Sequence, residues 1–382
     1  MKNIAVIIES STQFGRNLLS GIAKYGQMHD WNLHFEERGL KTTEPGWLEH
    51  WKGDGIIVRS LDQTISRAKS REGIPVLNLC AEGEQAFVAG MLINSDHLAV
   101  GALAADYFIG KGYERFAYIG YENRHYSTFR QEGYISKLEQ RGYECCSLEV
   151  PPIPDGDYQS RSRQIRQFLD DLVMPCAVFC ACDAVAVGVI NLCHELGKAV
   201  PEQLAVLGVD DDSLLCSMVF PSLSSIDPDI PRVGWLAASW LGAMMEGKDP
   251  HGMGIQRVVA PRGVTERLSS GVCAVSDPIV AKALEQIRLR ATEGARVKDI
   301  ANQCHVSQRL LERSFEKEMG VTVKRLLIET QLERIKGWLK DTDFTLAHIA
   351  ELAGMKYPER LSHMFKRETG MTPGQFRGQH RT

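Results

Sequence analysis

A repeated pattern in the last third of the chain constrains the fold most strongly. Residues 299–307 (DIANQCHVS) align with residues 348–356 (HIAELAGMK) at an offset of 49. After this segment the offset becomes 50, which pairs Leu311 with Leu361, Phe315 with Phe365, Gly320 with Gly370 and Thr322 with Thr372. Each copy predicts a helix, a short turn and a second helix, with an alanine where the two helices cross. The repeat therefore predicts two helix-turn-helix motifs.

The charge of the chain is divided unevenly. Residues 278–382 contain 19 Lys and Arg against 13 Asp and Glu, a local charge of +6. The remaining residues contain 25 against 35, a local charge of −10, and the whole chain has −4. An acidic body with a basic end is typical of a protein whose one end meets a polyanion. Charge alone agrees equally well with a solvated basic face.

Long polar side chains on the second helix of each motif favour DNA binding over a merely structural helical repeat. The predicted base-reading residues are Gln308, Arg309, Glu312 and Arg313 in the first copy and Glu359, Arg360, Ser362 and His363 in the second. Such side chains have the length and the hydrogen-bonding groups that base edges require. Lys317, Lys366 and Arg367 lie at or beyond the ends of these helices, where we expect phosphate contacts. The sequence therefore predicts a double-stranded DNA operator as partner.

The first 267 residues follow a different pattern, in which short apolar runs alternate with longer amphipathic segments. The predicted strands are 4–8, 55–59, 75–79, 90–94, 115–120, 176–180 and 204–208. The predicted helices are 16–25, 97–111, 129–141, 158–172, 184–196 and 230–245. Buried strands that alternate with helices indicate parallel α/β architecture, here in two lobes. We expect an α/β domain over 1–267, a linker over 268–277 and an all-α domain over 278–382.

Composition and motifs exclude several classes of protein. No apolar run approaches the ~18 residues of a membrane helix, and the opening run stops at Glu9, too early for a secretory signal. We therefore expect a cytoplasmic protein with no membrane partner. The ten cysteines include no C-x2-C pair, which predicts reduced thiols and no metal. The sequence has no dinucleotide, Walker, nucleophile-elbow or zinc-protease motif, so we expect neither enzymatic activity, catalytic residue nor cofactor.

The end of the second repeat resembles a known DNA-binding family. Residues 365–377 read FKRETGMTPGQFR, a close match to the pattern F-K-x-x-x-G-x-[ST]-P-x-x-[FY]-R of AraC/XylS-type domains. His363 stands where that family usually has an arginine, and Met355 where it usually has a phenylalanine. The resemblance implies the tandem helix-turn-helix fold for residues 278–382.

The first 267 residues resemble the LacI-type sugar-binding core, which is similar to periplasmic sugar-binding proteins. The resemblance is carried by Ile93-Asn94-Ser95-Asp96 before a helix and by the segments 115–120, 206–211 and 221–226. The combination of this core with an AraC-type domain resembles regulators of xylose use in enteric bacteria. It implies a sugar-responsive transcription regulator of pentose catabolic genes that binds a small neutral sugar, D-xylose first. It also implies a homodimer, and RNA polymerase is a further candidate partner.

The same resemblance points to the sugar-binding residues. Arg130 matches the family's R-x-x-G, Asp183 its D-x-x-A-x-G, and Asp210 is the first acid after a strand. Arg16 matches a further arginine of the xylose regulators. Charged groups with two hydrogen-bonding atoms are strong partners for a polyol, and we expect Phe14 and Phe220 to cover its apolar face.

Three alternatives remain open at this point. The effector can be another neutral pentose or hexose. The chain can be an enzyme fused to an AraC-type module, as in DNA-alkylation repair proteins with a reactive Pro-Cys-His-Arg; its one Pro-Cys, Pro175-Cys176, begins an apolar strand instead. A sugar receptor that does not bind DNA is the third, which the tandem repeat opposes.

Overall fold

The computed structural model describes residues 1–39, 44–59, 64–79, 93–152, 157–249, 253, 257–271, 275 and 277–380. The chain divides into two compact units, Met1–Cys273 and Ala274–Thr382. Among the described helices, none combines the length and the apolar character that a membrane crossing requires.

The first unit contains strands and helices in alternation. Its strands are β1 (Lys2–Ile7), β2 (Trp31–Phe35), β3 (Gly55–Val58), β4 (Val76–Asn78), β5 (Asn94–Ser95), β6 (Phe116–Tyr121), β7 (Cys145–Val150), β8 (Cys176–Cys180), β9 (Leu204–Val209), β10 (Ser224–Asp227), β11 (Val258–Val259) and β12 (Gly263–Thr265). Its helices are α1 (Gln13–Met28), the 3-10 helix η1 (Gly46–His50), α2 (Thr64–Arg71), α4 (His97–Gly110), α5 (His125–Glu139), α6 (Tyr158–Asp171), α7 (Asp183–Glu195), α8 (Ser213–Met218) and α9 (Ile230–Met245).

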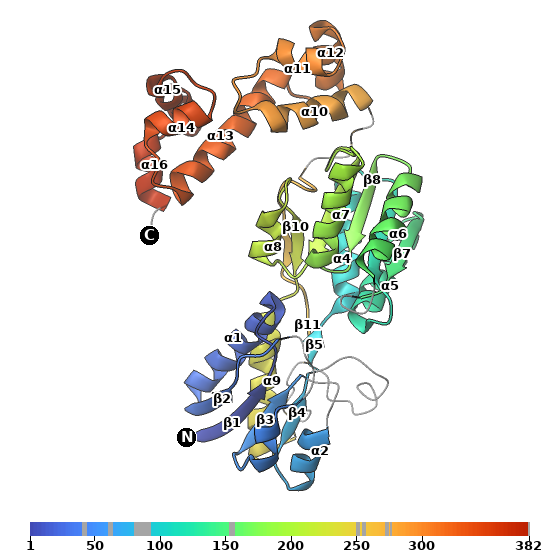
Figure 1. The fold of residues 1–382 in the computed structure, drawn as a ribbon, viewed down its shortest axis with the longest axis vertical. Coiled ribbons are helices and arrows are strands. Elements are labelled where there is room, and N and C mark those ends of the chain that lie inside the picture. Colours follow the sequence, from blue (N-terminus) through green and yellow to red (C-terminus); the bar gives the residue numbers. More distant parts are fainter. Residues whose placement is uncertain are drawn as a thin grey trace. The chain divides into compact units, whose positions relative to one another are not determined.

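Lobe 1 is built on a four-stranded parallel sheet in the order β2-β1-β3-β4 (Figure 1). Successive residues of β1 point to opposite faces. Ile4 and Val6 pack with residues of α1 and α9, whereas Ala5 and Ile7 pack with residues of η1 and α2. Both faces are covered from Ile4 to Ile7, which explains why this part of the strand is apolar at every position.

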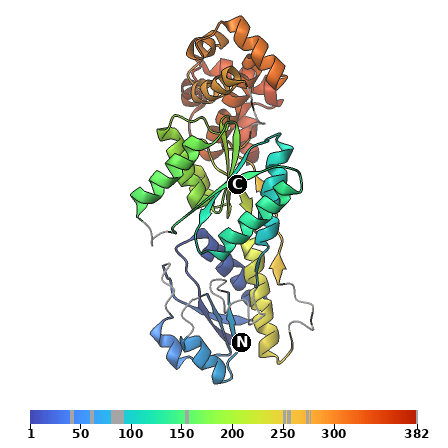
Figure 2. The same cartoon turned by 90° about the vertical axis from the view of Figure 1, so that its right-hand side faces the viewer.

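Lobe 2 is built on a six-stranded sheet in the order β12-β10-β9-β8-β6-β7, parallel except for β12. On one face Ile119 and Val178 pack with the apolar sides of α6 and α7. On the other face Phe179 packs against Tyr118 and against Tyr134 of α5. Figure 2 shows this sheet between its helices.

The chain passes between the two lobes three times. It leaves lobe 1 at β5, returns from β10 to α9, and leaves again at β11. β5 and β11 pair with each other in parallel. The Ser95 hydroxyl also donates to the Pro228 carbonyl at 3.0 Å, so the crossing segments are bonded together.

Each lobe contains a pair of helices that touch backbone to backbone. A Cβ on Gly101 of α4 would lie 2.1 Å from the carbonyl oxygen of Arg130, and one on Gly133 of α5 would lie 2.1 Å from that of Leu98. Gly21 of α1 and Gly234 of α9 make the same kind of crossing in lobe 1. Glycine is required there because any side chain would separate the helices.

The second unit is all-helical in its described part. Its helices are α10 (Pro278–Arg290), α11 (Val297–Gln303), α12 (Gln308–Met319), α13 (Val323–Asp341), α14 (Leu346–Leu352), α15 (Pro358–Thr369) and α16 (Pro373–His380). α11 with α12, and α14 with α15, form the two helix-turn-helix motifs, and the 19-residue α13 joins them. Side chains at matching positions, Leu311 with Leu361 and Phe315 with Phe365, are fully buried. The α/β core and the tandem helical domain predicted from the sequence are thus confirmed.

Differences from the sequence prediction are confined to edges and short elements. α5 begins at His125 rather than at residue 129, and the predicted strand 90–94 lies mostly outside the described residues. The prediction missed β2, β7, β10, β11, β12, η1, α2 and α8. Of the residues expected in the linker, Ser269 is fully buried; it donates to the carbonyl of Val206 and accepts from the amide of Ser224. Ser269 therefore belongs to the first unit.

Candidate functional site

A cavity of about 250 Å³ lies between the two lobes of the first unit. Lobe 1 contributes Glu9, Phe14 and Arg59 to its wall, and lobe 2 contributes Arg130, Asp183 and Asp210. Glu9, Arg59, Asp183 and Asp210 lie within three residues of a strand end, and the carboxyl ends of parallel strands meet at one edge of a sheet. The volume is below the ~300–1,000 Å³ of pockets for drug-sized ligands, which suits a small molecule.

Arg130 is the most deeply buried basic residue at the cavity, with 2% of its side chain exposed. Its Nη1 donates to the carbonyl oxygen of Ala181 at 2.5 Å, and its Nη2 lies 3.5 Å from Oδ1 of Asp210. The ring of Tyr126 lies 5.2 Å from the guanidinium carbon. Arg130 is therefore held in one orientation by α5, by the end of β8 and by an aromatic neighbour.

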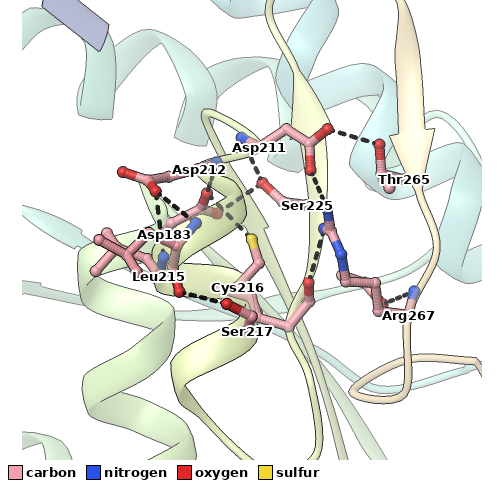
Figure 3. Close-up of polar contacts among 12 residues, drawn as sticks. Asp183, Asp211, Asp212, Leu215, Cys216, Ser217, Ser225, Thr265 and Arg267 are labelled. Atoms are coloured by element: carbon pink, nitrogen blue, oxygen red, sulfur yellow. Dashed lines mark hydrogen bonds and ion pairs between the residues drawn. The ribbon is translucent and has the colours of Figure 1, made fainter. Parts of the chain in front are cut away.

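Asp183 begins α7 and is fixed by donors on both carboxylate oxygens (Figure 3). The Ser225 hydroxyl donates to Oδ1 at 2.6 Å, and the Asp212 amide donates to Oδ2 at 2.8 Å. The Cys216 thiol also approaches Oδ2, at 3.5 Å. Burial, with a smaller contribution from the charge of Asp210, raises the pKa of Asp183 to about 8. Asp183 lines the cavity and also ties together β10, α7 and the loop after β9.

Asp210 leaves β9 with a positive φ of 115°, and Asp211 follows with φ 46°. Non-glycine residues in such conformations cost roughly 1–3 kcal/mol each and need support from their surroundings. The side chain of Asp211 supports this backbone conformation, because its carboxylate accepts hydrogen bonds from Thr265 at 2.8 Å and from Arg267 at 2.7 Å (Figure 3). Burial raises the pKa of Asp210 to about 6, and the neighbouring Arg130 opposes that rise.

Lobe 1 contributes a further pair of oppositely charged residues, Glu9 and Arg59. Glu9 is 8% exposed and accepts from Nη1 of Arg59 at 2.7 Å, and the guanidinium carbon of Arg59 lies 4.8 Å from the centre of the Phe14 ring. The sequence analysis missed Glu9 and Arg59. Both end or follow a predicted strand, which is the same signal that selected Asp183 and Asp210.

His97 and Tyr126 also line the cavity and were also missed. Burial and the nearby charge of Arg130 hold the pKa of His97 well below its usual value, so the imidazole is neutral. Within the described part of the chain, no three His, Cys, Asp or Glu side chains gather closely enough to hold a metal ion.

Two predicted ligand residues do not line this cavity. Arg16 is exposed, and its guanidinium donates to the Ser10 carbonyl at 2.9 Å and to the Gln13 side chain at 3.3 Å. Phe220 is 42% exposed. The structure thus brings together Phe14, Arg130, Asp183 and Asp210 and leaves Arg16 and Phe220 outside.

The second helix of each motif presents the polar face that the sequence predicts. Of the eight predicted base-reading residues only Ser362 is half-buried, and the others, Gln308, Arg309, Glu312, Arg313, Glu359, Arg360 and His363, are exposed. The Gln308 amide donates to the Glu312 carboxylate at 2.9 Å. These residues are available to a partner.

The three predicted phosphate-binding residues differ in their surroundings. Lys317 and Lys366 are exposed. Arg367 is exposed as well, but its guanidinium binds the Glu368 carboxylate at 2.7 Å, which also binds Arg325 at 2.7 Å. The charge of Arg367 is therefore partly balanced within the chain.

Comparisons with known proteins agree with this architecture. Residues 105–270 match a periplasmic binding protein-like domain, and residues 300–379 match a helix-turn-helix domain. The chain is 25% identical over 381 residues to the xylose operon regulatory protein of Haemophilus influenzae, covering 98% of this chain and 97% of that protein. It is 24% identical over 385 residues to the protein of the same name from Escherichia coli K12, covering 98% and 96%. The solved structure of a xylose-binding transcription activator superposes with a TM-score of 0.83 at 23% identity, over 100% of this chain and 99% of that one, and thus has the same fold.

Proposed function

We propose that this chain, a periplasmic binding protein-like domain followed by a helix-turn-helix domain, is a sugar-responsive transcription regulator. The observation that carries the proposal is the presence in one chain of a cavity lined by Arg130 and Asp210 and of two motifs with exposed polar reading helices. Its effector is a small neutral sugar, with D-xylose as the first candidate, and its targets are pentose catabolic genes.

The charges at the cavity favour an uncharged ligand. Glu9 pairs with Arg59 and Asp210 pairs with Arg130, so a phosphorylated sugar would have to compete with a carboxylate for each guanidinium group. A sugar hydroxyl both donates and accepts, and arginine and aspartate side chains offer paired atoms for adjacent hydroxyls. Phe14 offers the apolar surface on which the C–H face of a sugar ring can pack. The names of the full-length relatives support D-xylose among the neutral sugars.

The helical unit supports binding to two successive major-groove segments. At 1.5 Å per residue the 19 residues of α13 span about 28 Å, close to the ~34 Å between major-groove segments one turn apart. We assign base reading to the exposed residues of α12 and α15. Two chains in the same orientation would then read a direct repeat, which a homodimer provides. In this proposal the dimer acts in the cytoplasm and contacts RNA polymerase.

An enzyme fused to a DNA-binding module has little support. The cysteine of the Pro175-Cys176 pair lies buried in β8, and burial raises the pKa of its thiol to about 12. A thiol of this kind is a poor nucleophile at neutral pH, because the thiolate is the reactive form. The full-length relatives are named as regulators.

Two measurements on the full chain test the proposal. A panel of pentoses and hexoses in a thermal-shift assay should give stabilisation by one neutral sugar, about 2.7 kcal/mol at a hundredfold excess over Kd. Hydroxyl-radical footprinting on promoter DNA of pentose genes should show protection that recurs at ~10-bp intervals on one face. No shift with any sugar would reject the effector, and protection of a single ~5-bp segment per chain would mean that only one motif reads DNA.

A further inference from the structure

Besides α13, a direct backbone contact joins the second helix-turn-helix motif to the loop that leads into the first. Gly354, in the turn between α14 and α15, lies against the loop between α10 and α11. A Cβ on Gly354 would lie 2.3 Å from the amide nitrogen of Gly294 and 2.7 Å from the carbonyl oxygen of Thr292. Gly354 has φ +66° and Gly294 φ +73°, conformations that favour glycine. The backbone at the turn of the second motif therefore touches the backbone of the loop that leads into the first motif, with no side chain between them.

Two side chains of α13 strengthen this contact from both sides. The Gln331 amide donates to the Ala353 carbonyl at 2.6 Å, next to Gly354. The Arg334 guanidinium donates to the Arg288 carbonyl at 2.6 Å and to the Thr292 hydroxyl at 3.2 Å. Burial lowers the pKa of Arg334, as expected for a guanidinium enclosed between elements. One face of α13 thus binds both loops.

We infer that the Gly294–Gly354 contact fixes the distance and angle between the reading helices α12 and α15, so that the operator must have one set number of base pairs between its two read segments. A long helix alone bends along its length, which would change the distance between the motifs at its two ends. A second contact beside the helix opposes this bending, because the two halves are then connected at two places. Gly294, Gly354 and Arg334 are then positioning residues that touch no base. The inference rests on the proposed DNA-binding function.

The test measures tolerance to a change of spacing. The wild-type full chain selects a duplex from a random-sequence library, and two base pairs are then inserted between the two protected segments. Two base pairs turn one segment by about 70° relative to the other. The insertion should lower the affinity of the wild type at least about tenfold. Gly354→Ala should bind the selected duplex more weakly than the wild type, but the insertion should lower its affinity only about threefold or less.

Matched glycines in the same unit provide the controls. Gly320 and Gly370 end α12 and α15 with φ +66° and +77°, but a Cβ on either would meet nothing within 4 Å. Gly320→Ala and Gly370→Ala introduce the same kind of backbone strain but do not disturb the contact. The insertion should therefore lower their affinity as much as it lowers that of the wild type. If Gly354→Ala does not fold, as judged by circular dichroism, Arg334→Met tests the same contact and should also reduce the loss.

Each outcome decides the inference. A folded Gly354→Ala or Arg334→Met with the full wild-type loss overturns it, and so does an equal reduction in Gly370→Ala. A wild type that selects a duplex but tolerates insertion overturns the inference alone. A wild type that selects no duplex overturns it together with the proposed function.

Discussion

Arg130 and Asp210 form an ion pair, 3.5 Å between Nη2 and Oδ1, in which the two side chains are exposed to very different degrees. Arg130 is 2% exposed and Asp210 24%. Arg130 is anchored by its second bond, to the carbonyl of Ala181, whereas Asp210 keeps acceptor atoms for a ligand. The pair therefore has a fixed member and a member that a ligand can reach.

Removing the fixed member should affect both stability and binding. Arg130→Met leaves Asp210 without its cation, and breaking such a pair costs about 3 kcal/mol where one partner is buried. We expect a lower free energy of unfolding in urea and no sugar-induced thermal shift. Arg16→Met is the control, since Arg16 is exposed and does not line the cavity; it should change stability by less than about 0.5 kcal/mol and keep the thermal shift. Equal losses in both variants would contradict this role of Arg130.

Removing the charge of the reachable member should affect mainly binding. Asp210→Asn should weaken sugar binding by roughly 1.5–3 kcal/mol, the usual value of a hydrogen bond to a charged group. Isothermal titration calorimetry measures the affinity. Asp170→Asn provides a control, because Asp170 pairs with Lys198 on the outer surface of lobe 2 and should have no effect. If Asp210→Asn binds the sugar with unchanged affinity, the proposed location of the binding site is wrong.

The two aromatic residues predicted from the sequence should behave differently. Phe14 lines the cavity and Phe220 does not. Phe14→Leu should weaken sugar binding by about 0.5–1.5 kcal/mol, because a planar apolar face is lost. Phe220→Leu should leave the affinity unchanged in the same titration. The opposite order would mean that the ligand lies against α8 instead of in the cavity.

The stability of the ligand-free protein should fall as pH rises towards 8. Asp183 has a pKa of about 8 in the folded chain and an ordinary value of 3.8. Between these values the folded state holds a proton that the unfolded state has released, so the free energy of unfolding decreases with pH, by up to about 1.4 kcal/mol per unit. Urea unfolding at pH 6.5 and 8 measures the decrease. Asp183→Asn should reduce it, and an identical slope in that variant would show that other groups cause the decrease.

The basic residues of the helical unit should separate into positioning and reading contacts. Lys366→Ala should weaken specific and non-specific DNA binding alike and reduce the slope of log K against log salt by about one. Arg367→Ala should have a smaller effect, because Glu368 already balances that charge. Arg313→Ala should relax the preference at one base position by ~1–3 kcal/mol. Titrations of matched and mismatched duplexes at several salt concentrations test all three, and the same sequence-independent loss in each would contradict the division.

The sequence predicted the elements whose pattern is strongest. Both faces are buried throughout β6, β8 and β9 and over residues 4–7 of β1, so these segments are continuous apolar runs. β7 was missed because only Val150 of its six residues is fully buried. Edge strands such as β7 and β2 face solvent and carry mixed side chains, and short helices such as α8 have too few turns for a period to be recognised.

The site was predicted in part for a related reason. Arg130, Asp183 and Asp210 lie at strand ends or early in the following helix, which sequence alone can locate. Glu9 and Arg59 lie at the same kind of position, but their pairing across β1 and β3 becomes visible only when the strands are placed side by side. The sequence did not show that Phe14 points into the cavity and Arg16 points to solvent. Both lie in the first turn of α1, where too few residues precede them for a helical periodicity to indicate which side faces inward.

The glycine crossings of the two lobes limit how the sequence of this protein can drift. A substitution at Gly101 or Gly133 separates α4 from α5, because the new Cβ would lie 2.1 Å from the carbonyl oxygen of Arg130 or of Leu98, respectively. Either change therefore moves α5, the helix that carries Arg130. No single nucleotide change can supply the compensating shift of a whole helix. The position of Arg130 at the cavity therefore depends on the packing of this helix pair. We expect a new ligand specificity to arise by substitution of the cavity side chains and not of the glycines that let the helices touch.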